Sequence, residues 1–205
     1  MNATKHHGKE IILASESKRR IQLLEGLRIP FKSVPSTIIE PSFDSSHQKP
    51  AAFAISNARQ KAQSVAEKQE RSVVIGMDTI GEYEGRVFEK PRDRAHAREM
   101  IRLLSGTTHH VITGIAIIDS DSGQSVEAAE TTTVTFNSLS GNEIESYLDF
   151  GEWRGLACGY GIQGIGALFI EKVEGDYFNV VGFPLHRFYH LMKEMGLDIL
   201  KIMGE

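Results

Sequence analysis

The sequence predicts an α/β protein built on a mixed β-sheet. Short apolar segments alternate with helical periodicity in the first part of the 205 residues, as in parallel strands joined by helices. Longer runs rich in Val, Ile and Thr dominate the middle of the chain, and such runs favour antiparallel pairing. No repeat, low-complexity tract or flexible linker divides the sequence, so we expect one domain over residues 1–205.

The predicted elements begin with a buried strand over Ile11–Ala14. The apolar period then changes to that of a helix, for which Ser17 is a suitable N-cap. A second strand is predicted over Phe31–Val34, because this run follows a proline and ends at another. A polar connection runs from Pro35 to Pro50.

The next segment, Ala51–Lys68, repeats small and apolar residues at helical spacing and predicts a long helix. The β-branched run Ser72–Met77 predicts a strand that stops at Asp78. A hairpin turn can follow within Gly81–Gly85, and Asp93 can cap a third helix.

Two runs in the middle of the chain, His110–Ile118 and Glu130–Phe136, flank a turn-prone segment and predict a long antiparallel pair. The capping box Ser140–Glu143 opens a short helix. After a glycine-rich stretch, Ala167–Val173 returns to strand character, and Pro184 starts a last helix.

Composition narrows the class of protein. Apolar residues make up 40% and charged residues 24% of the chain, as in globular domains. The 27 acidic residues outnumber the 23 basic ones, and the net charge of −4 gives no overall basic field for nucleic acid. The single cysteine, Cys158, excludes an internal disulfide and any four-cysteine metal site. There is no apolar run of about 18 residues, and the polar start of the chain lacks the apolar core of a secretory signal, so we expect a cytoplasmic protein without a membrane span.

Hydroxyls and guanidinium groups are concentrated where the first strand meets the first helix. The residues concerned are Ser15, Ser17, Arg19 and Arg20. Free amides at a helix N-terminus attract anions, and guanidinium groups bind phosphate oxygens in a forked geometry. The motif alone does not separate a phosphate site from a capped helix with a solvated basic face.

Two acids and two bases are further candidates for chemistry. Asp78 follows a buried strand, where it can hold a divalent cation, accept a proton from an attacking water, or simply start a turn. Glu40 has a similar position after the second strand, although a lone acid there is more typical of solvated surface. Lys61 and Lys90 are the cations placed to complement these acids; Lys61 alone is typical of a solvated helix face, and Pro91 restrains the backbone next to Lys90.

The glycine-rich span around Gln163 is a candidate ligand site. Its glycines permit close backbone approach to a flat ligand, and the Gln163 amide offers one donor group and one acceptor to the edge of a base. A bulged, tightly bent sheet segment is the alternative. His109 and His110 are adjacent in a strand, so their rings face opposite ways and cannot share a metal, and Cys158 is expected to be a buried thiol.

The order and spacing of these motifs resemble the Maf family of nucleoside triphosphate pyrophosphatases, also called septum-formation-protein-like. The resemblance extends from about Ile11 to Gly196. The matching segments are Leu13–Arg20, Ala58–Ala62, Ile75–Thr79, Glu89–Pro91, Leu104–His109, Val134–Phe136, Tyr160–Gly164 and Gly175–Pro184.

The resemblance implies an elongated, mixed-sheet Maf/ITPase-like fold with two lobes around a deep nucleotide cleft, and homodimers are common in the family. It also implies hydrolysis of a nucleoside triphosphate to the monophosphate and pyrophosphate with a divalent cation, Mg²⁺ or Mn²⁺. The family's functional positions fall on Asp78 as proton acceptor, Lys90 and Lys61 as cleft lysines, Glu40 as acid, and Ser15, Ser17, Arg19 and Arg20 as phosphate-binding residues. We expect Glu40 and Asp78 to bind the cation between them. For Asp78 we rank the role of base ahead of the role of metal ligand.

Substrate specificity within the family follows three positions, which here are Arg19, Thr79 and Gln163. This set resembles the branch that acts on dTTP and UTP. One departure stands out: Gly155 and Leu156 replace an Asp-Lys pair that is usual in the family. The alternative function is therefore a nucleotide-binding regulator of cell division without turnover.

Overall fold

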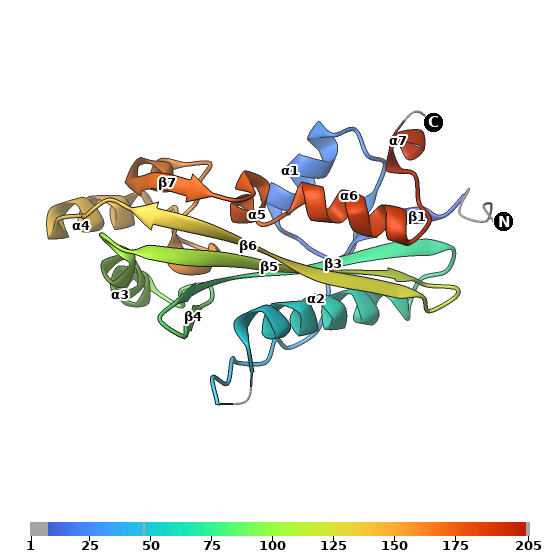
Figure 1. Ribbon diagram of the computed structural model, residues 1–205, viewed down its shortest axis with the longest axis horizontal. Helices are drawn as coiled ribbons and strands as arrows, with labels where there is room; N and C mark the ends of the chain where they lie inside the picture. Colours follow the sequence, from blue (N-terminus) through green and yellow to red (C-terminus); the bar gives the residue numbers. More distant parts are fainter. Residues whose placement is uncertain (1–7, 47, 204–205) are drawn as a thin grey trace.

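One mixed β-sheet extends along the computed structural model, which describes residues 8–46 and 48–203 (Figure 1). Within these ranges seven strands form the sheet in the order β2-β1-β3-β5-β6-β7, and β4 pairs with β3 off this path. The strands are β1 (Glu10–Leu13), β2 (Lys32–Ser33), β3 (Ser72–Tyr83), β4 (Arg86–Phe88), β5 (Thr108–Asp119), β6 (Ser125–Phe136) and β7 (Ile170–Glu174). Strands β2, β1 and β3 are parallel and the other pairings are antiparallel, which confirms the mixed sheet.

Helices cover both faces of this sheet (Figure 1). They are α1 (Lys18–Gly26), α2 (Pro50–Ala66), α3 (Arg94–Leu104), α4 (Gly141–Phe150), α5 (Tyr177–Val181), α6 (Leu185–Glu194) and α7 (Ile199–Ile202), with two short 3₁₀ segments, η1 (Ala157–Gly159) and η2 (Ile165–Phe169). None of the helices in the described ranges combines the length and the apolarity that a bilayer crossing needs. Residues 1–7, which belong to the polar start of the chain, lie outside the description.

The two-residue period of β3 decides which side chains meet which helix. Val73, Ile75 and Met77 pack in one core cluster with α1 and α6, whereas Val74 packs with the alanines of α2 on the opposite face. Alternate side chains of a strand point to opposite faces of a sheet. Asp78 is therefore directed to the α2 face and Thr79 to the α1 face.

The two largest core clusters lie at opposite ends of the elongated molecule (Figure 1). One joins β1 and α1 to α6 around residues such as Leu24 and Phe188. The other joins α3 and α4 around residues such as Leu104 and Tyr147. This division agrees with the predicted elongated α/β fold with two lobes.

The strand predicted to stop at Met77 is longer than expected, which corrects the placement of Asp78 after a strand. β3 continues to Tyr83, because β5 pairs with it from Val73 to Glu82 and supplies hydrogen-bond partners along that whole length. Its parallel neighbour β1 ends at Leu13, opposite Ile75. Asp78 thus lies within β3 but beyond the end of β1.

Several other boundaries differ from the prediction. The strand expected over Phe31–Val34 has only two residues, and the antiparallel pair β5–β6 is longer at both strands than the apolar runs suggested. The expected hairpin turn narrows to residues 84–85 between β3 and β4. The strand expected over Ala167–Val173 begins only at Ile170, after the 3₁₀ segment η2. The short helices α5 and α7 carry no pattern that predicted them.

Local capping signals in the sequence were more accurate than strand lengths. The Asp93 side chain accepts a hydrogen bond from the His96 backbone N–H at the start of α3. Ser140 and Glu143 form the complete capping box of α4. Ser17 occupies the N-cap position of α1 as predicted, but its side chain makes no capping hydrogen bond and remains available to other partners.

The two adjacent histidines of β5 face opposite ways, as predicted. His109 is fully buried, with its Nε2 atom 2.8 Å from the Tyr160 hydroxyl and its ring against Phe136. His110 contacts Glu82 through its Nδ1 atom. Burial lowers the pKa of His109 to about 4, and the neighbouring His110 adds to this effect.

We expect the protein to lose stability as the pH falls through this histidine's titration range. The pKa of His109 is below the ordinary value of 6.5 in the folded state, so the unfolded chain binds the proton first. The neutral His109 side chain contributes fully to the free energy of unfolding above pH 6.5. This contribution is lost between about pH 6.5 and 4, at a cost of about 3 kcal/mol. Urea titrations across this range should show a shallower pH dependence for His109→Phe than for the wild type; parallel curves would contradict the assignment.

Candidate active site

A cleft of about 510 Å³ brings together the site residues that the sequence predicts. These residues are Ser15, Ser17, Arg19, Arg20, Glu40, Lys61, Asp78, Thr79, Lys90 and Gln163. They come from α1 and the loop before it, the segment after β2, α2, β3, the segment after β4, and the glycine-rich loop. Arg19 and Asp78 therefore line the same cavity.

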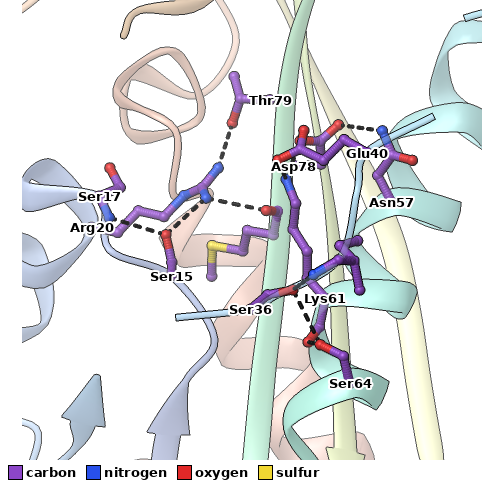
Figure 2. Close-up of polar contacts among 12 residues, drawn as sticks. Ser15, Ser17, Arg20, Ser36, Glu40, Asn57, Lys61, Ser64, Asp78 and Thr79 are labelled. Carbon is purple, nitrogen blue, oxygen red and sulfur yellow. Dashed lines mark hydrogen bonds and ion pairs between the residues drawn. The ribbon is translucent and has the colours of Figure 1, made fainter. Parts of the chain in front are cut away.

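The cleft forms where β1 ends and one edge of β3 is left without a strand neighbour. The Met77 carbonyl on this edge accepts a hydrogen bond from Arg20 Nη1 at 3.1 Å instead of from a strand. Because Asp78 and Thr79 point to opposite faces of the sheet, the cleft contains groups from both faces (Figure 2). A ligand at this edge can thus meet the acid on one side and the arginine-rich helix start on the other.

Both carboxylate oxygens of Asp78 accept hydrogen bonds from α2 (Figure 2). Lys61 Nζ lies 2.6 Å from Oδ1, and Asn57 Nδ2 lies 3.0 Å from Oδ2. All three residues are buried, with exposed fractions of 8% for Lys61, 7% for Asp78 and zero for Asn57. These two donors fix the rotation of the Asp78 carboxylate. The role of Asn57 escaped the sequence analysis, since one asparagine among the apolar positions of a helix carries no motif.

Two glycines of the sheet allow α2 to come this close. A Cβ atom on Gly76 would lie 2.1 Å from the Ala58 carbonyl oxygen, and one on Gly114 would lie 2.2 Å from the Ala54 backbone. Gly114 is the residue paired with Asp78 across β3 and β5. Direct contact of the α2 backbone with the sheet therefore places Asn57 and Lys61 within hydrogen-bond distance of the acid.

Glu40 completes an acidic group around the same lysine. Its Oε1 atom lies 3.0 Å from Lys61 Nζ, so one ammonium contacts two carboxylates. Glu89 lies close enough to these two carboxylates for their charges to act on it. Burial chiefly raises the pKa of Glu89, and the charges of Asp78 and Glu40 raise it further. Lys90 lines the cleft and makes no ion pair with any described residue.

Arg20 joins three walls of the cleft. Its Nε donates to the Gly182 carbonyl at 2.8 Å, Nη1 donates to Ser15 Oγ at 3.2 Å and to Met77, and Nη2 donates to Thr79 Oγ1 at 3.0 Å. Burial lowers the pKa of Arg20 to about 10, opposed by Asp78, so the group stays charged at neutral pH. Most of its donors are thus engaged within the protein, and the phosphate contact expected of Arg20 is limited to what remains of its Nη2 group.

Arg19 differs from its neighbour in having a buried donor that is unpaired. Its Nε atom is buried without a hydrogen-bond partner among the described residues. Burial lowers the pKa of Arg19, and the charge of Glu152 acts in the opposite direction. A buried, unpaired guanidinium N–H is costly unless a ligand binds it, and an anion is the natural partner.

Glu152 is a second residue that the sequence analysis missed. Its carboxylate accepts the backbone N–H groups of Ile165 at 2.5 Å and Gly166 at 3.0 Å, beneath the loop that carries Gln163. A Cβ atom on Gly164 would lie 2.2 Å from Glu152 Oε2, which explains this glycine. The acid lies in a glycine-rich stretch without any recognisable pattern, so no sequence signal marked it.

The glycine-rich stretch forms turns and 3₁₀ segments outside the sheet, so the alternative of a bulged sheet segment is wrong. Gln163 is exposed at the cleft. Gly155 and Leu156, at the position of the missing Asp-Lys pair, also line it. Cys158 is the buried thiol that was predicted, and burial raises its pKa to about 12, so it is not a nucleophile at neutral pH.

Curated relatives align with most of the length of this chain. A dTTP/UTP pyrophosphatase of Bacillus cereus (strain ATCC 10987 / NRS 248) is 43% identical over 191 residues, which is 93% of this chain and 92% of the relative. A dTTP/UTP pyrophosphatase of Bacillus anthracis is 42% identical over 191 residues, which is 93% of this chain and 98% of the relative.

Solved structures are more distant. The Ham1 protein of Staphylococcus aureus aligns with a TM-score of 0.44 at 17% identity, over 62% of this chain and 72% of that one. A nucleoside-triphosphatase / dITP/XTP pyrophosphatase of Mycobacterium abscessus aligns with a TM-score of 0.40 at 15% identity, over 69% of this chain and 95% of that one. The family described as Maf-like protein matches residues 10–195, nearly the whole chain. Together with the two relatives, this match shows that the chain belongs to the Maf family.

Proposed function

We propose that this protein hydrolyses nucleoside triphosphates, with dTTP, UTP or a modified pyrimidine nucleotide as substrate, to the nucleoside monophosphate and pyrophosphate. The observation that carries the proposal is a buried carboxylate, Asp78, fixed at both oxygens in the same cleft as Arg19, whose buried Nε has no hydrogen-bond partner among the described residues. The names of the curated relatives support the same reaction class.

The residues divide the chemistry by charge. Water attacks the α-phosphorus, the bond to the bridging oxygen breaks, and pyrophosphate leaves with the electron pair of that bond. Asp78, held at Oδ2 by the Asn57 amide, orients the water and accepts its proton. Arg19 and Lys90 bind the phosphates and stabilise the charge on the leaving pyrophosphate. Ser15 and Ser17 contribute hydroxyls at the start of α1.

The acids of the cleft fit a divalent cation. Glu40 and Asp78 already share one cationic group, the Lys61 ammonium, which stands in the position of a cation between two carboxylates. No cluster of three or more metal-ligating side chains occurs in the described part of the chain, so Glu40 and Asp78 would hold the ion with phosphate oxygens and water. Mg²⁺ and Mn²⁺ suit such oxygen ligands, and the bound ion would neutralise phosphate charge.

Pyrophosphate release from a panel of nucleotides tests the proposal. Wild-type protein should release pyrophosphate from dTTP and UTP in the presence of Mg²⁺ or Mn²⁺, and from purine nucleotides much more slowly. Nucleotide binding measured by calorimetry without any release would favour the non-catalytic regulator instead. The need for Mg²⁺ or Mn²⁺ and the formation of a homodimer stay predictions.

We expect Gln163→Glu to reduce kcat/KM for dTTP and UTP by about tenfold or more, since a carboxylate removes the amide donor offered to the base and adds negative charge to a cleft that binds an anionic substrate. The glutamine is exposed at the cleft on the loop that Glu152 supports. Competition assays with mixed nucleotides measure the change in selectivity. Gln124→Glu introduces the same charge at the exposed turn between β5 and β6 and should leave kcat/KM unchanged. Equal selectivity in both variants would show that Gln163 does not contact the base.

A further inference from the structure

The Lys61 ammonium lies between the two carboxylates that face the cleft (Figure 2). Its Nζ atom is 2.6 Å from Asp78 Oδ1 and 3.0 Å from Glu40 Oε1. The lysine stem rises from α2, which direct contact with the sheet holds in place. The side chain is almost fully buried, so the ammonium exchanges its water for these two acids.

The Lys61 ammonium offsets the negative charge of neighbouring carboxylates that would otherwise repel one another. Glu40 and Asp78 bring like charges together near Glu89, whose pKa is raised first by burial and then by the charges of Asp78 and Glu40. Asn57 satisfies only Asp78 Oδ2 and carries no charge. Among the described residues, Lys61 alone forms ion pairs with these carboxylates.

The same two carboxylates would hold a divalent cation, because carboxylate oxygens suit Mg²⁺ and Mn²⁺. In this structure the Lys61 ammonium occupies the position between them. Two cationic groups cannot share this position, because both size and charge repulsion oppose it. Lys90 lines the same cleft but makes no ion pair with Glu40 or Asp78, so it does not occupy the position between them.

We propose that Lys61 is an internal competitor of the divalent cation: its ammonium holds Glu40 and Asp78 together in the unliganded protein and is displaced when the ion binds. The flexible lysine stem then directs the ammonium toward the phosphates in the cleft. This inference rests on the proposed function for its cation, but it concerns binding and not turnover.

Cation binding without nucleotide provides the first test. Mn²⁺ is titrated into wild-type protein, Lys61→Gln and Lys90→Gln, and free Mn²⁺ is followed by electron paramagnetic resonance. Both variants remove one positive charge from the cleft, but only one removes the competitor. We expect Kd for Mn²⁺ to fall about tenfold in Lys61→Gln and less than about threefold in Lys90→Gln.

Three outcomes of this titration would overturn the inference. They are equal tightening in the two variants, weaker binding in Lys61→Gln, or no binding in any of the three proteins. Pyrophosphate release is measured separately on wild-type protein. If Lys61→Gln binds Mn²⁺ more tightly but the wild type releases no pyrophosphate, the proposed function is contradicted. The role of Lys61 as a competitor of the cation is then still supported.

A second test uses wild-type protein alone and so does not depend on the folding of Lys61→Gln. Lysines are acylated with and without Mg²⁺, and the modified peptides are quantified by mass spectrometry. Labelling at Lys61 should rise at least threefold with Mg²⁺, because displacement exposes the amine, whereas labelling at the distant Lys193 should stay constant. Unchanged labelling at Lys61 in saturating Mg²⁺ would refute displacement.

Discussion

Replacement of Asp78 by asparagine should lower kcat for pyrophosphate release by about 10²- to 10⁴-fold, the range lost when a positioned base is removed. The amide keeps the size of the side chain but cannot accept a proton from water at neutral pH. Arg19, which binds phosphate in our proposal, is untouched, so nucleotide affinity should change by only a few-fold. Stopped assays of pyrophosphate release and calorimetric titrations of the same preparation separate the two quantities.

Glu82→Gln is the matched control for this substitution. Glu82 belongs to the same strand and has a hydrogen-bonded carboxylate, but its partners are His110 and the Gly85 backbone N–H, and it does not line the cleft. Its kcat should remain within about twofold of the wild-type value. Retention of more than a tenth of kcat in Asp78→Asn would remove the base from the mechanism and leave Asp78 as a ligand or a structural acid.

The largest effect on stability is expected from Gly114→Ala. The added methyl group would lie 2.2 Å from the Ala54 backbone, so α2 must move away from the sheet. Overpacking of a core costs about 1–3 kcal/mol and occasionally more, and contact with rigid backbone favours the upper end. We expect the free energy of unfolding, measured in urea, to fall by about 3 kcal/mol.

The same displacement of α2 should reduce activity beyond any loss of folded protein. Lys61 and Asn57 reach Asp78 only because the helix lies directly on Gly76 and Gly114. Gly141→Ala serves as the control: Gly141 starts α4, and its added methyl group has no contact within 4 Å beyond its chain neighbours and the backbone of its own helix. That variant should be neutral or slightly more stable. Equal stability of the two variants would contradict the proposed packing.

Local signals in the sequence predicted most of the fold. Hydrophobic period and β-branching located the main helices and strands, and the caps at Asp93 and Ser140 were correct in detail. Strand lengths were not predictable in this way. β3 extends past Met77 because β5 pairs with it, and pairing is a property of two distant segments rather than of either one.

The composition of the cleft followed from motifs and from the resemblance to the Maf family. The residues named from the sequence all line one cavity. The separate role of each residue in the cleft did not follow from the motifs. Arg19 and Arg20 are adjacent and chemically identical, yet one has a buried free donor and the other is bonded to three walls. Asn57 and Glu152 carried no signal because each acts on a residue that is distant in the chain or on a backbone amide.

The sequence by itself determined where the main helices and strands form and which chemical groups the protein can use, because period, capping and residue type are local properties. Only the tertiary structure decided that Asp78 and Thr79 serve the same cleft from opposite faces of β3, and that Lys61 lies between two acids. The reason is physical: these relations depend on where β1 ends and on how closely α2 packs against two glycines, and both are set by contacts between distant parts of the chain.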